Sequence, residues 1–435
     1  MGVQAVCVFA HGHSRMQMPL KIGKSEMLLN LPDENLKQVI LPNEVAPLPN
    51  PLKTVEHALE NPTGTPSLAD LLQSRRPDRI AIVVNDITRP TPYDIMLPPL
   101  LRTLEEAGVR PEQVTFVVAT GIHRPHTDEE NRRIFGADVV NRYRFVNHDC
   151  VADDLVTVGR LSDGTDLIIN RHVAEADLLI TTGLIGLHYF AGYSGGRKSI
   201  LPGVAAKSLI THNHKKMTDP RASTARYKDN PVHHIMMEAA RMVGVDFILN
   251  VVTNEKKQVV AVVAGDLEAA WLEGVAVCER MAIVRAEEQA DVTICSAGGF
   301  PKDLDVYQSQ KAMEAADQVT RPGGTIVLVA DCSEGYGGEA ALERWVREAE
   351  SLDDIFRRFE AHFELGGHKA YAIARVLREK EVVLVSPQPP ELARSLWMRP
   401  AATLEEALDY VRQKHGPDFK AYLLPHATLV FPVVG

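Results

Sequence analysis

The chain has 435 residues and a formal net charge of −10, with 45% hydrophobic and 24% charged residues. This composition is typical of a folded globular protein that is long enough for two or three domains. The acidic balance argues against a protein that binds nucleic acid through phosphate contacts, and an anionic ligand would need a local basic pocket.

The cysteine content and the N-terminal sequence indicate the compartment. The five cysteines include no C-x-x-C pair and their number is odd, which fits a reducing cytosol better than a disulfide framework. The apolar run from Val3 to Ala10 is not preceded by a basic segment, so no signal peptide is expected. No apolar run reaches the length that spans a bilayer. We therefore expect a cytoplasmic protein with no membrane partner and no nucleic-acid partner.

The first half of the chain predicts an α/β domain after a short extension. Residues 1–18 are expected to form an N-terminal extension, and an alternating pattern typical of a strand or hairpin starts near Leu20. The proline-rich segment 42–51 indicates an extended connector. Three apolar runs then predict buried strands, over residues 79–84, 114–119 and 177–182.

Chemically capable side chains follow each of these three runs. They are Asp86 and Arg89 after the first run, His123 after the second and His188 after the third. Parallel strands would bring them to one edge of a sheet, where open α/β folds bind ligands. Each residue alone is also explained by a cap or a loop hydrogen bond, whereas three such loops together favour a functional site. After His123, Thr127 and Glu130 have the spacing of a capping box and predict a helix start.

The stretch HYFAGYSGGRKSILPG, from His188 to Gly203, carries the densest chemistry. A glycine-rich turn can direct backbone N–H groups at an anion, and two cations follow it. The residues concerned are Ser194, Gly195, Gly196, Arg197 and Lys198. The stretch is not a P-loop, because that motif needs glycine directly before the lysine and Arg197 stands there. On these residues alone, a phosphate site of another kind and a basic surface turn both remain open.

The second half of the chain continues the α/β pattern. A helix over residues 205–216 would carry His214, and a second α/β pattern begins near Asp291. The first helix of that pattern carries three polar side chains, Tyr307, Gln308 and Lys311. Tyr307 and Lys311 are four residues apart and share a helix face.

These patterns predict an α/β fold with two α/β/α domains and mostly parallel sheets. An N-terminal catalytic and cofactor-binding domain is expected over residues 19–275. A C-terminal α/β domain is expected over residues 276–435, and its last segment can pack back onto the region between the domains. The active site is expected in the N-terminal domain, at the interdomain cleft.

The motifs of two common enzyme classes are missing from the chain. There is no G-x-G-x-x-G after the first strand and no H-E-x-x-H, which disfavours an ordinary Rossmann dehydrogenase and a zincin. Histidines on separate loops suit acid–base chemistry near neutral pH. His214 is either a ligand for nickel, copper or zinc or a helix histidine without a function. Arg89 and Lys311 could hold a carboxylate.

Five segments, taken in order, resemble the nickel-dependent lactate racemase family. They are DITRP at 86–90, TGIHRPHT at 120–127, HYFAGYSGGRKSILPG at 188–203, NH at 213–214 and YQSQK at 307–311. The resemblance extends over roughly residues 20–430. It implies a racemase or epimerase of a 2-hydroxy acid. It also implies a nickel-pincer nucleotide (pyridinium-3-thioamide-5-thiocarboxylate mononucleotide), in which a ring carbon and two sulfurs hold nickel.

The resemblance implies a role for each matched residue. His123 and His188 would be the acid–base pair, and His214 would be the protein ligand to nickel. Lys198 would be the lysine that can attach to the cofactor covalently, through a thioamide. The others would bind the cofactor (Asp86, Ser194, Gly195, Gly196 and Arg197) or the substrate (Arg89, Tyr307, Gln308 and Lys311).

The implied chemistry explains why two histidines are needed. Removing the α-proton of a 2-hydroxy acid beside its carboxylate is difficult, whereas moving hydride avoids a dianion. One histidine would take the hydroxyl proton, and the flat 2-keto acid would turn before hydride returns to its other face. The implied partners are a small 2-hydroxy acid and the cofactor-biosynthesis proteins, and a homo-oligomer is left open.

One stretch departs from the family pattern. Lactate-active members place a tryptophan of the second domain near the substrate, whereas the comparable region, GGHKAYA at 366–372, has none. A longer or more polar 2-hydroxy acid is therefore expected. His368 and Lys369 could meet its second carboxylate or lie on the surface. The alternatives to a racemase are a nicotinamide-dependent 2-hydroxy-acid dehydrogenase-like enzyme and a non-catalytic carrier of the nickel cofactor.

Overall fold

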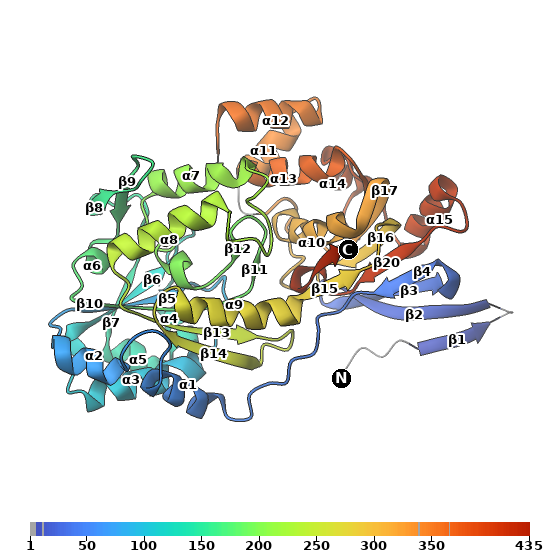
Figure 1. Cartoon of the computed structure of the whole chain (residues 1–435). Helices are drawn as coiled ribbons and strands as arrows, with labels where there is room; N and C mark the ends of the chain where they lie inside the picture. Colours follow the sequence, from blue (N-terminus) through green and yellow to red (C-terminus); the bar gives the residue numbers. More distant parts are fainter. Residues whose placement is uncertain (1–5, 11–12, 338–339, 365) are drawn as a thin grey trace. The chain divides into compact units, whose positions relative to one another are not determined.

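The computed structural model describes residues 6–10, 13–337, 340–364 and 366–435. The chain forms two compact units: unit 1 comprises Met1–Asn43 and Ala282–Gly435, and unit 2 comprises Glu44–Met281. Both are mixed α/β units with largely parallel sheets, which confirms the predicted fold class (Figure 1). Among the described residues, no helix combines the length and the hydropathy that crossing a bilayer requires.

The main sheet of unit 2 has the strand order β14-β13-β10-β5-β6-β7. Its strands are β5 (Ile80–Asn85), β6 (Val114–Ala119), β7 (Arg144–Asn147), β10 (Leu178–Leu184), β13 (Phe247–Thr253) and β14 (Val259–Gly265). Neighbouring strands are parallel except β13 and β14. The three predicted strands are thus β5, β6 and β10. They lie side by side, and their carboxyl ends share one edge of the sheet as expected.

Helices cover both faces of this sheet, as Figure 1 shows with α7 and α8 above the strands and α1 to α3 below. The helices are α1 (Pro51–Glu60), α2 (Leu68–Arg75), α3 (Tyr93–Glu106), α4 (Asp128–Phe135), α5 (Ala137–Arg142), α6 (Arg171–Ala174), α7 (Lys207–Lys215), α8 (Pro231–Val243) and α9 (Ala269–Ala282). The β-branched runs of the strands are buried because apolar side chains of α1 to α3 pack against them.

Two further features of unit 2 bear on the site. The predicted capping box is confirmed, since the Thr127 hydroxyl accepts the Glu130 N–H and the Glu130 carboxylate accepts the Thr127 N–H at the start of α4. After β10 the chain forms the short hairpin β11 (Leu187–His188) and β12 (Gly192–Tyr193), followed by the 3-10 turn η3 (Gly196–Ser199). A second hairpin, β8 (Val156–Arg160) and β9 (Asp166–Ile169), lies before β10.

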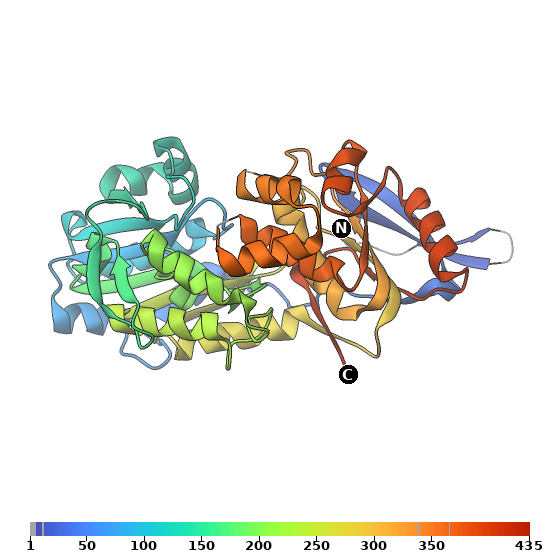
Figure 2. The same ribbon diagram turned by 90° about the horizontal axis from the view of Figure 1, so that it is seen from above.

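The main sheet of unit 1 is parallel throughout, with the order β19-β18-β17-β16-β20-β4. Its strands are β4 (Leu36–Val39), β16 (Ala290–Ser296), β17 (Thr320–Val329), β18 (Glu381–Val385), β19 (Arg399–Ala401) and β20 (Ala421–Leu424). The helices are α10 (Val306–Val319), α11 (Ala340–Glu348), α12 (Leu352–Ala361), α13 (Gly367–Leu377), α14 (Pro390–Ser395) and α15 (Leu404–His415), shown in yellow to red in Figure 2. Strands β15 (Ile283–Ala286) and β21 (Phe431–Val434) form a separate parallel pair.

The N-terminal segment differs from its predicted assignment. Strands β1 (Val6–Ala10), β2 (His13–Ile22) and β3 (Ser25–Pro32) form an antiparallel sheet, so part of the expected extension 1–18 is β-structure, while residues 1–5 and 11–12 lie outside the described residues. Residues 19–43 belong to unit 1 rather than to the N-terminal domain. The reason is that β4 pairs with β20, and apolar side chains of β2 and β3 join the core of that sheet. At the other boundary, α9 runs through residue 275 and unit 2 ends at Met281.

Candidate active site

The ends of β5 and β6 bring Asp86 and His123 together. Asp86 is buried, and its Oδ2 lies 2.6 Å from Nδ1 of His123. Thr88 donates to the other carboxylate oxygen from its backbone N–H (3.2 Å) and its hydroxyl (2.6 Å). Burial raises the pKa of Asp86, but the hydrogen bonds from His123 and Thr88 outweigh it and hold that pKa below its usual value. The ionised carboxylate therefore fixes the proton of a neutral His123 at Nδ1 and leaves Nε2 as a base.

Two predicted site residues that contact Asp86, His123 and Arg89, have positions that suit a ligand site. The His123 side chain is 44% exposed, so a small molecule can reach its ring. Arg89 is half-buried, and its backbone N–H donates to the Asp86 carbonyl at 3.0 Å. Its positive charge lowers the pKa of both Asp86 and Lys198.

The hairpin after β10 pairs His188 with Lys198. Nε2 of His188 lies 3.3 Å from Nζ of Lys198. The backbone N–H of Ala191 points at Nδ1 of His188 at 3.3 Å, so Nδ1 accepts and the proton of the neutral ring lies at Nε2. Burial, followed by the charges of Arg89 and Arg197, holds the pKa of Lys198 well below its usual value. The resulting neutral amine can accept the His188 N–H and can act as a nucleophile.

His214 on α7 lies near the same residues. Its ring centroid is 5.0 Å from that of Phe190, which also contacts His188 at 4.6 Å and has Nζ of Lys198 5.8 Å above its ring. Burial lowers the pKa of His214 to about 3, so the imidazole is neutral and suited to bind a metal. Among the described residues, no group of three or more His, Cys, Asp or Glu side chains is placed to hold a metal ion.

The turn that carries Lys198 is held together by Arg197. The Arg197 guanidinium is fully buried, and its Nε donates to Nδ1 of His233 on α8 at 3.1 Å. Its centre lies 4.2 Å from the ring centroid of Trp271 on α9. Its remaining nitrogens donate, at 2.9 to 3.3 Å, to the backbone carbonyls of Ala191, Ser194 and Gly195.

This packing bears on the two alternatives that the sequence left open for residues 194–197, a phosphate site and a basic surface turn. The N–H of Ser194 donates to a neighbouring backbone carbonyl, and that of Gly196 donates to Oδ1 of Asn250, each at 2.8 Å. The Arg197 side chain points into the core rather than toward an anion, because α8 and α9 supply an aromatic and an imidazole that enclose it. Arg197 and the N–H groups of Ser194 and Gly196 are therefore engaged within the protein, and the burial of Arg197 excludes the basic surface turn. The cofactor-binding role of residues 194–197 stays a prediction.

The same turn contains GYSGG at 192–196, which matches the G-x-S-x-G pattern of serine hydrolases. Ser194 is buried, its hydroxyl donates to the Leu184 carbonyl at 2.8 Å, and it accepts the Gly186 N–H at 2.9 Å. A hydrolase nucleophile needs an accessible hydroxyl beside a general base. Ser194 therefore fastens the hairpin and does not act as a nucleophile.

Unit 1 groups the three residues expected to bind substrate at the start of α10. The Asp305 carboxylate caps this helix by accepting the Gln308 N–H at 2.7 Å. Nζ of Lys311 donates to Oε1 of Gln308 at 2.5 Å, and both side chains are half-buried. Tyr307 lies one turn before Lys311 and is half-buried as well. The four-residue spacing thus places them in one polar cluster, as expected.

His368 and Lys369, on α13, lie behind this cluster. Lys369 is 1% exposed, its Nζ donates to Oε1 of Gln310 at 2.9 Å, and it lies 4.7 Å from the Tyr307 ring centroid. Burial, then the charge of Lys311, holds the pKa of Lys369 well below its usual value. His368 is also buried, with its ring 5.9 Å from that of Tyr307. The surface interpretation is wrong, and both side chains support Tyr307 from within unit 1.

The low pKa of Lys198 predicts a measurable reactivity. Only the neutral amine reacts with acylating reagents, so the labelling rate of Lys198 is expected to reach its plateau well below pH 10. Because the Arg89 charge lowers this pKa, the variant Arg89→Met is expected to move the midpoint of the labelling profile to higher pH. Peptide mass spectrometry after limited acylation measures both profiles. A wild-type midpoint at the ordinary lysine value of about 10.4 would contradict the assignment.

Two family models match the chain. The model of the lactate racemase N-terminal domain matches residues 22–225, and that of the lactate racemase C-terminal domain matches residues 285–431.

Similar proteins cover nearly the whole chain. A protein named lactate racemase from Thermoanaerobacterium thermosaccharolyticum is 35% identical over 418 residues, and the match covers 94% of this chain and 97% of that protein. A protein of the same name from Lactiplantibacillus plantarum is 36% identical over 417 residues, and the match covers 93% of this chain and 97% of that protein. The solved lactate racemase apoprotein from T. thermosaccharolyticum matches with a TM-score of 0.90 at 34% identity, over 96% of this chain and 99% of that one.

Proposed function

The chain belongs to the lactate racemase family and is a racemase, and we propose that it inverts the hydroxyl-bearing carbon of a 2-hydroxy acid with His123 and His188 as acid–base groups. The observation that carries the proposal is the pairing of each histidine in unit 2. His123 lies 2.6 Å from Asp86, and His188 lies 3.3 Å from Lys198. His123 offers a lone pair at its Nε2, whereas His188 offers a proton at its Nε2. Inversion needs such groups on both faces of the substrate carbon.

Family membership implies a nickel-pincer nucleotide, and the residues of unit 2 fit such a group. The neutral amine of Lys198 is the form that can become a thioamide nitrogen, and the neutral imidazole of His214 is the form that binds nickel. Nδ2 of Asn250 is fully buried and has no hydrogen-bond partner within the described residues, which suits an anionic group such as a phosphate. When bound, the nucleotide would accept hydride from the substrate carbon and return it.

The histidines of the chain itself move the hydroxyl proton. The Nε2 lone pair of His123, maintained by the Asp86 carboxylate, takes the hydroxyl proton of one enantiomer. The substrate then becomes a flat 2-keto acid that can present either face. The Nε2 proton of His188 passes to the carbonyl oxygen as the opposite enantiomer forms. The proton that His123 took up returns to the His188 ring through solvent, so that both rings regain their starting protonation, and the reverse direction retraces these steps.

Substrate recognition follows from the placement of the remaining residues. Arg89 is proposed to hold the substrate carboxylate, because a planar guanidinium matches it with two parallel hydrogen bonds. Tyr307, Gln308 and Lys311 keep their proposed substrate-binding role in unit 1. The stretch 366–372 has no tryptophan, which supports a longer or more polar 2-hydroxy acid than lactate.

The cellular setting is part of the same proposal. A cytoplasmic location agrees with the odd number of cysteines and with the free thiols of Cys150, Cys278, Cys295 and Cys332. The proteins that synthesise the nickel nucleotide are the expected partners, since the chain must acquire the group from them.

Holo-protein produced together with the cofactor-biosynthesis proteins tests the proposal. Each pure enantiomer of a panel of 2-hydroxy acids, lactate included, is incubated with it and analysed by chiral chromatography. Both enantiomers of at least one acid are expected to converge on the same mixture. Oxidation coupled to NADH formation would instead indicate a dehydrogenase. Tight binding of the nickel nucleotide without interconversion across the panel would indicate a carrier.

A further inference from the structure

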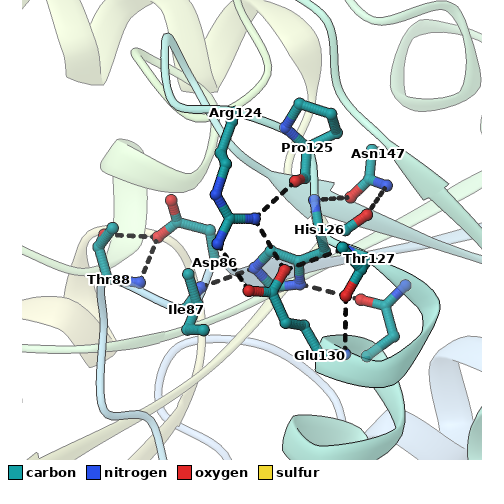
Figure 3. Close-up of polar contacts among 10 residues, drawn as sticks. Asp86, Ile87, Thr88, Arg124, Pro125, His126, Thr127, Glu130 and Asn147 are labelled. Atoms are coloured by element: carbon teal, nitrogen blue, oxygen red, sulfur yellow. Dashed lines mark hydrogen bonds and ion pairs between the residues drawn. The ribbon is translucent and has the colours of Figure 1, made fainter. Parts of the chain in front are cut away.

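The segment TGIHRPHT contains a second histidine, His126, that is bonded at both ring nitrogens (Figure 3). The backbone N–H of Ile87 donates to Nε2 at 2.7 Å, and Nδ1 lies 2.9 Å from Oδ1 of Asn131. A backbone N–H can only donate, so Nε2 must carry a lone pair and Nδ1 the proton. His126 is 6% exposed and is neutral in this arrangement. Its two nitrogens are therefore engaged with the protein rather than available to a ligand.

The His126 ring is fixed to the sheet and to α4. Its backbone N–H donates to Oδ1 of Asn147 at 3.1 Å, and Nδ2 of Asn147, at the end of β7, donates back to its carbonyl at 3.0 Å (Figure 3). The next residue, Thr127, is the N-cap of α4. Phe135 of the same helix packs against the imidazole, with ring centroids 6.2 Å apart. These contacts hold the His126 imidazole in a fixed position relative to β7 and α4.

Ile87 connects this fixed ring to the candidate active site. It stands between Asp86, whose Oδ2 contacts His123, and Thr88, whose N–H and hydroxyl hold Oδ1 of the same carboxylate. The Ile87 side chain is 37% exposed, so its burial does little to hold the loop. The hydrogen bond from the Ile87 N–H to His126 therefore fixes the backbone at the point where the carboxylate is presented.

We propose that His126 is a positioning residue: by accepting the Ile87 N–H, it holds Asp86 against His123. The inference rests on the proposed catalytic role of His123, whereas the contacts of His126 stand independently of it. A shift of about 1 Å in the loop would break the contact between Asp86 and His123. The His123 proton would then move to Nε2, where an isolated histidine ring prefers it, and the lone pair directed at the substrate would be lost.

Two substitutions of His126 distinguish its hydrogen bond with the Ile87 N–H from its other packing contacts, because only one of them can keep that hydrogen bond. In His126→Gln, the side-chain oxygen can take the place of Nε2 and accept the Ile87 N–H. In His126→Asn, the amide can take the place of Nδ1 and still donate to Asn131, but it is too short to reach Ile87. Both variants keep a polar side chain in the buried position, which limits the risk of unfolding.

Nitrogen NMR of cofactor-free protein with labelled histidine reports the His123 tautomer without any need for activity. The buried His148, whose Nε2 lies 2.9 Å from the Ala205 carbonyl, is the reference for the folded state. At a pH where His123 is neutral, wild type and His126→Gln are expected to show its proton at Nδ1, and His126→Asn to lose that tautomer.

In enzyme that carries the nickel nucleotide, His126→Asn is expected to lower kcat about tenfold or more and to change KM by no more than about threefold. The kcat of His126→Gln is expected to stay within about threefold of the wild-type value. An unchanged tautomer and kcat in His126→Asn would overturn the inference, and so would equal losses in both variants with an unchanged His148 signal. If wild type has the expected tautomer but does not racemize any acid, the proposed function fails and the positioning of His123 stands.

Discussion

Replacing His123 by glutamine is expected to lower kcat for racemization by about 10²- to 10⁴-fold in both directions, without loss of nickel. Glutamine keeps a polar side chain beside Asp86 but cannot exchange a proton. Each inversion requires a proton to be taken at one face and given at the other, so the loss of one histidine blocks both directions. Chiral chromatography from each pure enantiomer measures the two rates.

The variant His188→Gln is expected to lose racemization to a similar extent, and the double variant is expected to lose little more than either single variant. This follows because the two rings act in one catalytic sequence, and residues that act as a unit have strongly non-additive effects. The matched control is His57→Gln, which changes an exposed histidine on α1. A single variant that keeps the wild-type rate would remove that histidine from the mechanism, and fully additive losses would argue against their joint action.

Loss of cofactor is the second large effect that we expect. Protein produced together with the cofactor-biosynthesis proteins should carry an added mass and nickel, and Lys198→Ala should carry no covalent addition. His214→Ala should keep the covalent addition but retain at least about tenfold less nickel after dialysis against a chelator, because a neutral imidazole ligand is lost. Intact mass spectrometry and metal analysis on the same samples separate the two roles.

The control for the nickel experiment lies on the same helix. His212→Ala changes a half-buried histidine of α7 whose Nε2 contacts the Asp163 carboxylate at 2.7 Å. It is expected to retain nickel as the wild type does. Equal retention by His214→Ala would show that another group binds the metal. A covalent addition that survives in Lys198→Ala would place the linkage on a different residue.

The parts of the fold that the sequence predicts are those decided by local patterns. Strands β5, β6 and β10 are buried on both faces, so they appear as continuous apolar runs, and the parallel arrangement then brings their terminal loops together. The assignment of residues 19–43 fails for the opposite reason. Strand β4 pairs with β20 from the far end of the chain, and no local pattern reports such a pairing.

The sequence predicts the site less well, because residues far away along the chain determine which site side chains are buried. Arg197 follows a glycine-rich turn, which suggests an exposed anion site, but Trp271 and His233 enclose its guanidinium from other helices. The sequence alone does not distinguish the roles of His123 and His126 in the segment HRPH. Their roles differ because one ring meets Asp86 and the other meets the Ile87 N–H and Asn131.

Racemization in deuterium oxide tests most directly the central proposal that hydride leaves the substrate carbon while the histidines handle only the hydroxyl proton. One pure enantiomer is incubated with loaded protein, and the newly formed enantiomer is analysed for deuterium at C2 by mass spectrometry. Retention of protium at C2 is predicted, because the hydrogen returns from within the site. Deuterium at C2 at the solvent level would show direct proton abstraction and contradict the proposal.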